Sequence, residues 1–207
     1  MKLVRPAVTV AALACLAGGV TAHAAVAKPV CNLVTDPAGD ASVQAPLPSD
    51  DSLDILSGDV ASNAKNVTTV MRLKNLSATS PVAQTGRNYY ALFSIPGSAN
   101  PVYFSLEEDA TGQSFNWGDL EPGAGGVGTY TRKGDATGVV DTAKNEIRVT
   151  VPVSDLSALG KAKPGTKITD LNFSTTAVLG VLVSDVDTAD GSKSYVAGTA
   201  SCVKPGK

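Results

Sequence analysis

Histidine is nearly absent from this chain. The only one among its 207 residues, His23, lies in an N-terminal segment that we predict to be removed on export. Without imidazole, the rest of the chain cannot build a Ser-His-Asp or Cys-His nucleophile. It also lacks the usual imidazole ligands of zinc, copper and non-haem iron. Oxygen donors remain, and these favour calcium or magnesium.

Basic charge and aromatic side chains are also sparse. Lys and Arg number 17 against 19 Asp and Glu, and aromatic residues make up 5% of the chain with a single tryptophan. No basic stripe is present, so nucleic-acid binding has no electrostatic basis. Nor does a polybasic tail offer contact with an anionic membrane. We therefore expect neither partner.

The first 24 residues have the pattern of a signal peptide. Lys2 and Arg5 supply positive charge, Ala7–Val20 is an apolar run too short to span a bilayer, and Ala22-His23-Ala24 fits a small-x-small cleavage site. We expect residues 1–24 to be a signal peptide and residues 25–207 to form one domain. The protein is then secreted and extracellular, with no membrane span.

Two cysteines remain after that cleavage, because Cys15 leaves with the signal segment. An even pair in an exported protein predicts a disulfide, here between Cys31 and Cys202 near the two ends of the chain. The alternative is two free buried thiols.

Short β-prone segments separated by Gly, Pro, Asn and Asp predict an all-β fold. Residues 53–61 and 67–76 are expected to form an antiparallel hairpin, and residues 145–153 alternate most cleanly between apolar and polar. A helical turn or two is expected after Ser154, and residues 185–191 are expected to form an acidic turn. The pattern favours a single antiparallel β-sandwich of jelly-roll type with one or two short helical turns.

Two acidic segments are candidate calcium sites. Asp36-Pro-Ala-Gly-Asp40 has the composition of a tight turn, and Asp54 begins the first convincing strand. A second cluster contains Asp187, but its spacing does not match an EF-hand loop. Calcium takes six to eight oxygen ligands, which turns supply as carboxylates and carbonyls. We predict calcium ligands at Asp36, Asp40, Asp54 and Asp187; the alternative is Asx-turns and solvated loop ends.

Aromatic side chains offer candidate contacts for a sugar ring. Trp117, Tyr103 and Tyr130 are the candidates, with Trp117 next to Asn116 and near Asp119. Core packing is the competing role for each.

No catalytic pattern is evident. Glycosidase chemistry needs two carboxylates facing each other across a cleft, whereas Glu107 and Glu108 are adjacent and would point to opposite faces of a strand. Glu121 and Glu146 remain as the candidates for a hydrolase that uses carboxylates alone. We expect a protein that is not an enzyme.

Several segments together resemble a module of secreted bacterial proteins. They include Asp36–Asp40, Leu53–Val60, Tyr89–Phe93, Val151–Leu156 and Asp187–Ala189 with Ser201-Cys202. That module is found alone or behind subtilisin-like proteases, and it is similar in pattern to family 9 carbohydrate-binding and related jelly-roll domains. The resemblance implies a β-sandwich, a calcium corner near Asp36, Asp40 and Asp54, and a binding or accessory role. The chain has neither a protease domain nor the paired tryptophans of a sugar-binding cleft.

The leading hypothesis is a secreted, non-catalytic binding or accessory β-sandwich, stabilised by a disulfide and calcium, whose ligand is an extracellular glycan or protein. The alternatives are a structural or surface-interaction protein without a small ligand, and a carboxylate-based hydrolase.

Overall fold

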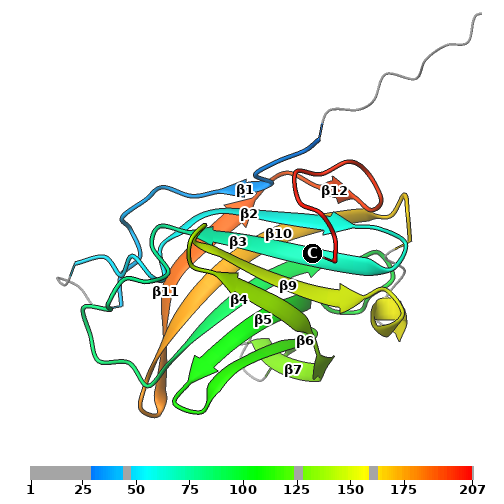
Figure 1. The fold of residues 1–207 in the computed structure, drawn as a ribbon. Coiled ribbons are helices and arrows are strands. Elements are labelled where there is room, and N and C mark those ends of the chain that lie inside the picture. The colour runs from blue at the N-terminus through cyan, green and yellow to red at the C-terminus, as the bar shows by residue number, and fades with distance from the viewer. Residues whose placement is uncertain (1–28, 44–47, 124–127, 159–162, 207) are drawn as a thin grey trace, which may run out of the picture.

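Two antiparallel β-sheets packed face to face make up the structure, a computed structural model that describes residues 29–43, 48–123, 128–158 and 163–206 (Figure 1). The predicted signal peptide lies outside these residues. The only helical element in the described part is a 3₁₀ turn, η2 (Asp155–Ala158). The prediction of an all-β sandwich with a short helical turn after Ser154 is confirmed.

The first sheet has five strands in the order β1-β2-β3-β9-β8. Their bounds are β1 (Val34–Thr35), β2 (Ile55–Ser62), β3 (Asn66–Leu73), β9 (Glu146–Pro152) and β8 (Thr137–Asp141). The predicted hairpin is the β2–β3 pair, in which Gly58 lies opposite Met71. Its strands are almost entirely buried, because the second sheet covers one side and the two ends of the chain cross the other.

The second sheet has the order β11-β10-β4-β5-β6-β7, and β12 pairs with one end of β10. Its strands are β4 (Gly86–Ser94), β5 (Val102–Asp109), β6 (Gly112–Pro122), β7 (Gly128–Asp135), β10 (Lys167–Leu179), β11 (Leu182–Gly191) and β12 (Tyr195–Val196). At Ala136 the chain passes from β7 in this sheet to β8 in the first sheet, so one side of the sandwich is closed by continuous chain.

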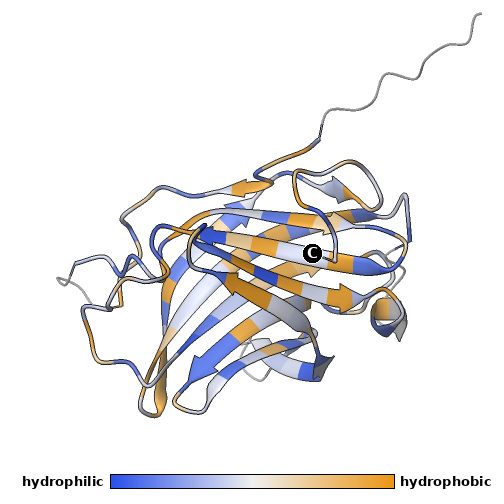
Figure 2. Ribbon diagram, in the orientation of Figure 1, coloured by the Kyte–Doolittle hydropathy of each residue, from blue (hydrophilic) through white to orange (hydrophobic). Residues whose placement is uncertain are grey.

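The main core fills the space between the sheets. Alternate residues of β4 and β5 point into it, including Phe93 and Phe104, whose rings meet edge to face at 5.1 Å. Phe173 of β10 crosses to the first sheet, where its ring occupies the space above Gly58. Figure 2 shows the resulting alternation of apolar and polar residues along the strands. This alternation is the sequence signal on which the fold prediction depended.

Two segments differ from their predicted structure. Residues 185–191 form the second half of β11 and not an acidic turn. Val186 and Ala189 are buried there, and pairing with β10 outweighs the turn tendency of the aspartates. Strand β8 was not anticipated, because Thr137–Asp141 is short and glycine-containing and is held only by its pairing with β9.

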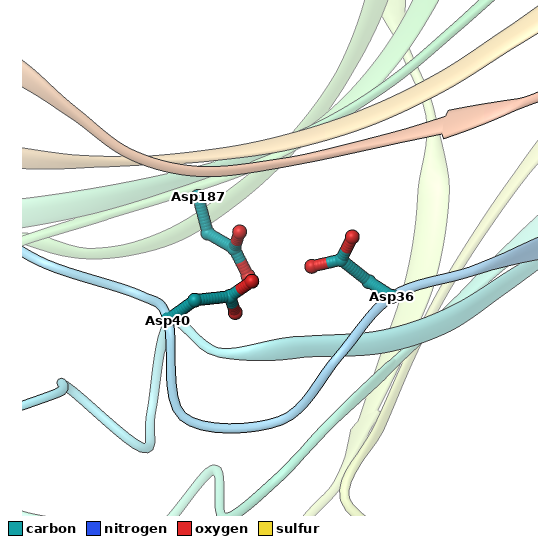
Figure 3. Close-up of side chains that lie close together, drawn as sticks. All are labelled: Asp36, Asp40 and Asp187. Atoms are coloured by element: carbon teal, nitrogen blue, oxygen red, sulfur yellow. The ribbon is translucent and has the colours of Figure 1, made fainter.

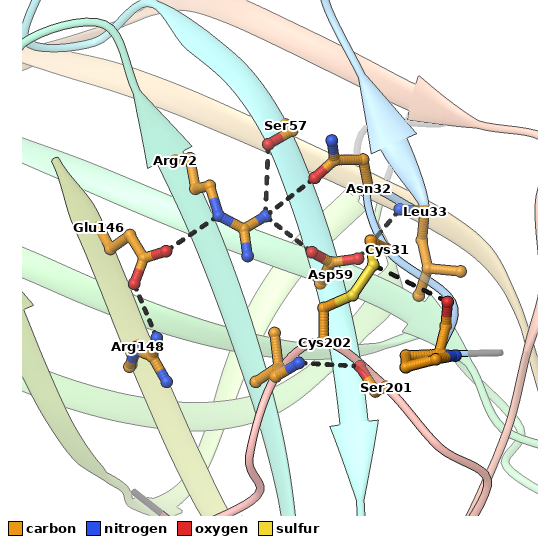
Figure 4. A network of polar contacts seen from close by, with 12 residues as sticks. Cys31, Asn32, Leu33, Ser57, Asp59, Arg72, Glu146, Arg148, Ser201 and Cys202 are labelled. Carbon is orange, nitrogen blue, oxygen red and sulfur yellow. Dashed lines mark hydrogen bonds and ion pairs between the residues drawn. A yellow bond between two sulfur atoms is a disulfide. The ribbon is translucent and has the colours of Figure 1, made fainter. Parts of the chain in front are cut away.

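The predicted disulfide between Cys31 and Cys202 is present, with 5.3 Å between the two Cα atoms. Beside it, Asp59 is fully buried, and its carboxylate accepts the backbone N–H of Leu33 and an Arg72 N–H at 2.7 Å (Figure 4). Arg72 also donates to Glu146, which in turn binds Arg148. This network and the disulfide attach the N-terminal segment to the first sheet directly before β1.

Candidate metal site and ligand-binding surfaces

The turn Asp36–Asp40 follows β1 and is attached to the start of the first sheet. The backbone N–H of Asp36 donates to the carbonyl of Leu56. Gly39 has φ of +96°, a left-handed conformation that glycine adopts without strain, and its N–H donates to Asp54 Oδ2 at 2.7 Å. The Pro-Ala-Gly sequence thus folds the turn so that Asp36 and Asp40 point back toward the sandwich.

Asp187 reaches the same point from β11 in the second sheet. Its two carboxylate oxygens accept the backbone N–H groups of Ile55 and Thr188, at 2.7 and 2.8 Å. Carboxylate oxygens of Asp36, Asp40 and Asp187 lie within 4.8 Å of one another (Figure 3). The sequence indicated two separate acidic clusters, and the fold joins them into one, because β11 runs beside β1.

Burial and neighbouring carboxylates disfavour the charged forms of Asp36 and Asp187, whereas Asp40 is exposed. Burial, followed by the charges of Asp187 and Asp40, raises the pKa of Asp36 to about 6. The pKa of Asp187 is also raised, mainly by burial, although its two backbone hydrogen bonds act in the opposite direction. Both shifts show that the surroundings disfavour the charged form of each carboxylate.

Asp54 lies next to these three residues and is fully buried. One of its oxygens accepts the Gly39 N–H, whereas the other, Oδ1, is buried without a hydrogen-bond partner. Asp36 Oδ2 is also buried without a hydrogen-bond partner. In the described part of the chain, Lys74 is the only basic residue that forms an ion pair with any of the four carboxylates. It lies 3.6 Å from Asp54 and closer, at 2.8 Å, to Asp51.

Four carboxylates with one basic neighbour can hold a divalent cation of the hard, oxygen-preferring type. The donor set consists of oxygen atoms alone, as the absence of histidine from the predicted domain requires. All four predicted metal ligands are therefore neighbours in the fold, with Asp36, Asp40 and Asp187 closest together.

The predicted aromatic residues lie in different places. Trp117 is in the main core and is 6% exposed. Tyr103 is 2% exposed on the opposite face of the second sheet, and burial raises its pKa to about 12. Tyr130 is 41% exposed and stacks on Tyr90 at 4.3 Å between ring centroids. Of the three, only Tyr130 offers substantial surface to a ligand.

The remaining candidate carboxylates are engaged with basic residues in different sheets. Glu146 in β9 binds Arg72 and Arg148, and Glu121 in β6 binds Lys133 at 3.0 Å. A buried, doubly paired carboxylate such as Glu146 has its pKa lowered by these cations, against the effect of its burial. That is the reverse of the shift a general acid needs.

Sequence reasoning missed a groove at the end of the sandwich. It is lined by residues 79–87, 108–110, 112 and 113 and has a volume of about 850 Å³. Arg87 belongs to it, as do Gln84 and Gln113. No sequence motif marks this site, because it is formed by a loop and a hairpin that meet only after the sheets have packed.

Comparison with protein-family models, with curated proteins and with solved structures yields no match for this chain. No helix in the described ranges is long and apolar enough to cross a membrane. The fold and the acidic corner define the class of protein: an antiparallel β-sandwich with an all-oxygen candidate cation site between its N-terminal turn and both sheets.

Proposed function

We propose that the protein is a secreted, non-catalytic binding or accessory module whose β-sandwich is stabilised by calcium. The observation that carries this proposal is the cluster of Asp36, Asp40 and Asp187 with Asp54 beside it, in which Asp36 Oδ2 and Asp54 Oδ1 are buried without a hydrogen-bond partner. A buried carboxylate oxygen without a hydrogen-bond partner is unfavourable. A bound cation would remove that penalty and the repulsion between the acids.

Calcium fits this donor set better than other common cations. Zinc and copper prefer nitrogen and sulfur ligands, which are absent here. Magnesium demands near-ideal octahedral geometry, whereas calcium accepts irregular arrays of carboxylates, carbonyls and water. The corner combines acids from a turn, from the residue before β2 and from β11, an arrangement of the irregular kind.

Calcium at this position would have a structural effect. Asp36 and Asp40 follow β1, Asp54 precedes β2 in the first sheet, and Asp187 belongs to β11 in the second sheet. An ion shared by these groups would connect the N-terminal segment to both sheets. The disulfide attaches the same segment a few residues earlier. The disulfide and the ion would therefore hold the segment at two successive points.

Thermal melting with and without calcium tests the proposal. Calcium at 100 times its dissociation constant should raise the free energy of unfolding by about 2.7 kcal/mol relative to chelator. Asp187→Asn should lose most of this gain, whereas Asp185→Asn, an exposed position on the same strand, should retain it. An identical melting midpoint in calcium and in EDTA would show that no tight site exists.

The exported location and the ligand class are parts of the same proposal. The disulfide is compatible with an oxidising extracellular environment. A glycan is the ligand class we propose, with an extracellular protein as the alternative. Tyr130 is an exposed aromatic ring on which a sugar could stack, and the polar groove at the end of the sandwich is a second surface.

A further inference from the structure

We propose that the groove at the end of the sandwich is the ligand site, and that it takes a short neutral oligosaccharide. This inference rests on the binding function proposed above and gives it a place and a ligand class. The groove has a volume of about 850 Å³, within the roughly 300–1,000 Å³ of small-molecule sites.

The strands of the second sheet form one wall of the groove. Arg87 of β4 lies opposite Glu108 of β5, which in turn lies opposite Gln113 of β6. These positions continue the core-facing rows of their strands, in which Tyr89 and Leu106 are fully buried. At this end the core-facing side of three neighbouring strands thus changes from apolar to polar.

The segment Thr79–Thr85 forms the other wall. It is held in place by Gln84, whose side-chain amide donates to the buried carboxylate of Asp50 at 2.8 Å and to Ser80 at 2.7 Å. The carbonyl oxygen of Gln84, Oε1, is buried without a hydrogen-bond partner. Val82 packs against the main core, which fixes the loop over the strand ends.

The polar groups of the groove are of mixed character. Arg87 is a donor only. Burial raises the pKa of the Tyr89 hydroxyl, and the charge of Arg87 and a hydrogen bond from it partly offset this, so the guanidinium lies beside that hydroxyl. No ion pair of Arg87 is found in the described part of the chain. Glu108 is an acceptor and takes a hydrogen bond from the Gln113 amide at 2.6 Å, while the second amide N–H and the carbonyl oxygen of Gln113 add a donor and an acceptor.

Sugar hydroxyls both donate and accept hydrogen bonds. They therefore match such a set of donors and acceptors better than a ligand that only donates or only accepts. The formal charge of the lining is slightly negative, because Arg87 is outnumbered by Glu108 and Asp109. Phosphates, nucleotides and other anions are therefore disfavoured. Small apolar surfaces against which the C–H face of a sugar ring can pack come from Pro81, Val82, Ala83 and Ala110.

The groove is a better candidate than the tyrosine cluster on the outer face of the second sheet. Tyr90, Tyr103 and Tyr130 pack on one another, with ring centroids 4.3 to 5.9 Å apart. Those contacts use one face of the Tyr130 ring and nearly all of Tyr103. The groove, in contrast, is open space lined by Arg87, Glu108 and Gln113 on one wall and by the loop of residues 79–85 on the other.

Titration with neutral oligosaccharides tests the site directly. Calcium-loaded protein would be titrated with cellohexaose, xylohexaose, maltohexaose and chitohexaose, and binding followed by calorimetry and by amide chemical shifts. At least one oligosaccharide should bind, with the largest shifts in residues 79–87 and 108–113. Arg87→Ala should weaken binding about tenfold or more, as expected for the loss of a hydrogen bond from a charged donor.

Three further variants keep the test decisive. Ala110→Arg lies in an exposed turn, so the protein should fold normally while the longer side chain obstructs the groove and abolishes binding. Val139→Thr, at an exposed position of β8 outside the groove, should leave affinity unchanged. Absence of binding by all four oligosaccharides at millimolar concentration overturns the proposal, as does binding that is lost in Tyr130→Ala and retained in Ala110→Arg. Calcium-dependent melting, measured on the same samples, reports separately on the metal site.

Discussion

Asp54 attaches the Asp36–Asp40 turn to the start of β2 beside the candidate metal site. It is fully buried, it anchors the Asp36–Asp40 turn through the Gly39 N–H, and its second oxygen has no partner. An ionised carboxylate in such surroundings is costly unless a positive group faces it. Lys74, at 3.6 Å and partly exposed, supplies only part of that compensation.

Asp54→Asn is expected to have opposite effects with and without calcium. The asparagine oxygen can still accept the Gly39 N–H, while its NH₂ group would face the position of the unpartnered Oδ1. Removal of one negative charge should raise the melting temperature in EDTA. In calcium, loss of a ligand should lower the melting temperature relative to wild type. Melting curves of both proteins under both conditions check this, and a decrease in EDTA of the same size as in calcium would contradict it.

Gly58 is required by the ring of Phe173. A Cβ atom at residue 58 would lie 2.3 Å from that ring, closer than any real contact. Gly58→Ala should therefore destabilise the protein by about 1–3 kcal/mol, the range typical of overpacking. Urea denaturation of Gly58→Ala, of Phe173→Leu and of the double mutant measures the coupling free energy between the two positions. The smaller leucine should relieve the clash, so strictly additive effects would contradict this explanation.

At the scale of elements, the N-terminal segment and β1 connect the disulfide to the metal site. Cys31 is bonded to Cys202, Leu33 is held by Asp59, and Asp36 comes directly after β1. The segment has only a two-residue strand of its own, so its position depends on these attachments. Loss of one attachment should therefore loosen the neighbouring residues on its C-terminal side, including the Asp36–Asp40 turn.

The double variant Cys31→Ser/Cys202→Ser tests this dependence. Loss of a cross-link over a sequence separation of 171 residues should lower the free energy of unfolding by about 2–5 kcal/mol. Calcium affinity, measured by calorimetry below the melting temperature, should fall as well, because the Asp36–Asp40 turn becomes less ordered. Unchanged affinity in a folded variant would mean that the turn is held by Asp54 and Asp187 alone. Wild-type protein treated with a reductant should behave like the variant.

The sequence predicts those elements whose apolar residues alternate strongly. The β2–β3 hairpin and β9 fall within a few residues of their predicted positions, since Ile147, Val149 and Val151 all face the core. The end of β11 was mistaken for a turn, because Asp185–Gly191 is rich in turn-forming residues and its strand character comes from β10. The composition of a segment does not reveal which strand it will pair with.

The sequence likewise predicts a site only where its residues are brought together by local structure. Asp36, Asp40 and Asp54 are close in sequence, and turn chemistry brings them together. The contribution of Asp187 to the same corner depends on β11 lying next to β1, which only the packed sandwich provides. The groove around Arg87 depends on tertiary packing alone, and it had no sequence signal.

At the scale of the whole molecule, the acidic corner lies where β1 and β2 of the first sheet meet β11 of the second. The main core holds the sheets together through apolar contacts along their length. At the corner carboxylates lie next to core residues such as Ile55 and Val186, and the contribution of these carboxylates to stability changes sign with their charge and with bound metal. Stability of the whole sandwich should therefore depend on pH in a way that calcium reverses.

The pKa of Asp36 is raised from 3.8 to about 6 in the folded, calcium-free protein, first by burial and then by neighbouring carboxylates, and that of Asp187 is raised as well. Between the unfolded and folded pKa values of Asp36, the folded state binds more protons than the unfolded state. The free energy of unfolding therefore falls as pH increases over this range. Below pH 4 both states are protonated at Asp36, and the penalty is absent. Above about pH 6 it is fully present. Glu146, whose pKa is lowered, contributes the opposite slope only at more acidic pH.

Urea denaturation at pH 4.5, 5.5, 6.5 and 7.5 measures this dependence on protein freed of calcium by chelation and desalting. The unfolding midpoint should decrease across the series, and Asp36→Asn should flatten the decrease because the titrating group is gone. Saturating calcium should reverse the slope, since the ion binds the ionised carboxylates and competes with protons for them. A calcium-free midpoint that rises from pH 4.5 to 7.5 would mean that attraction to basic groups such as Lys74 outweighs the repulsion among the four acids, and the corner would then need no cation.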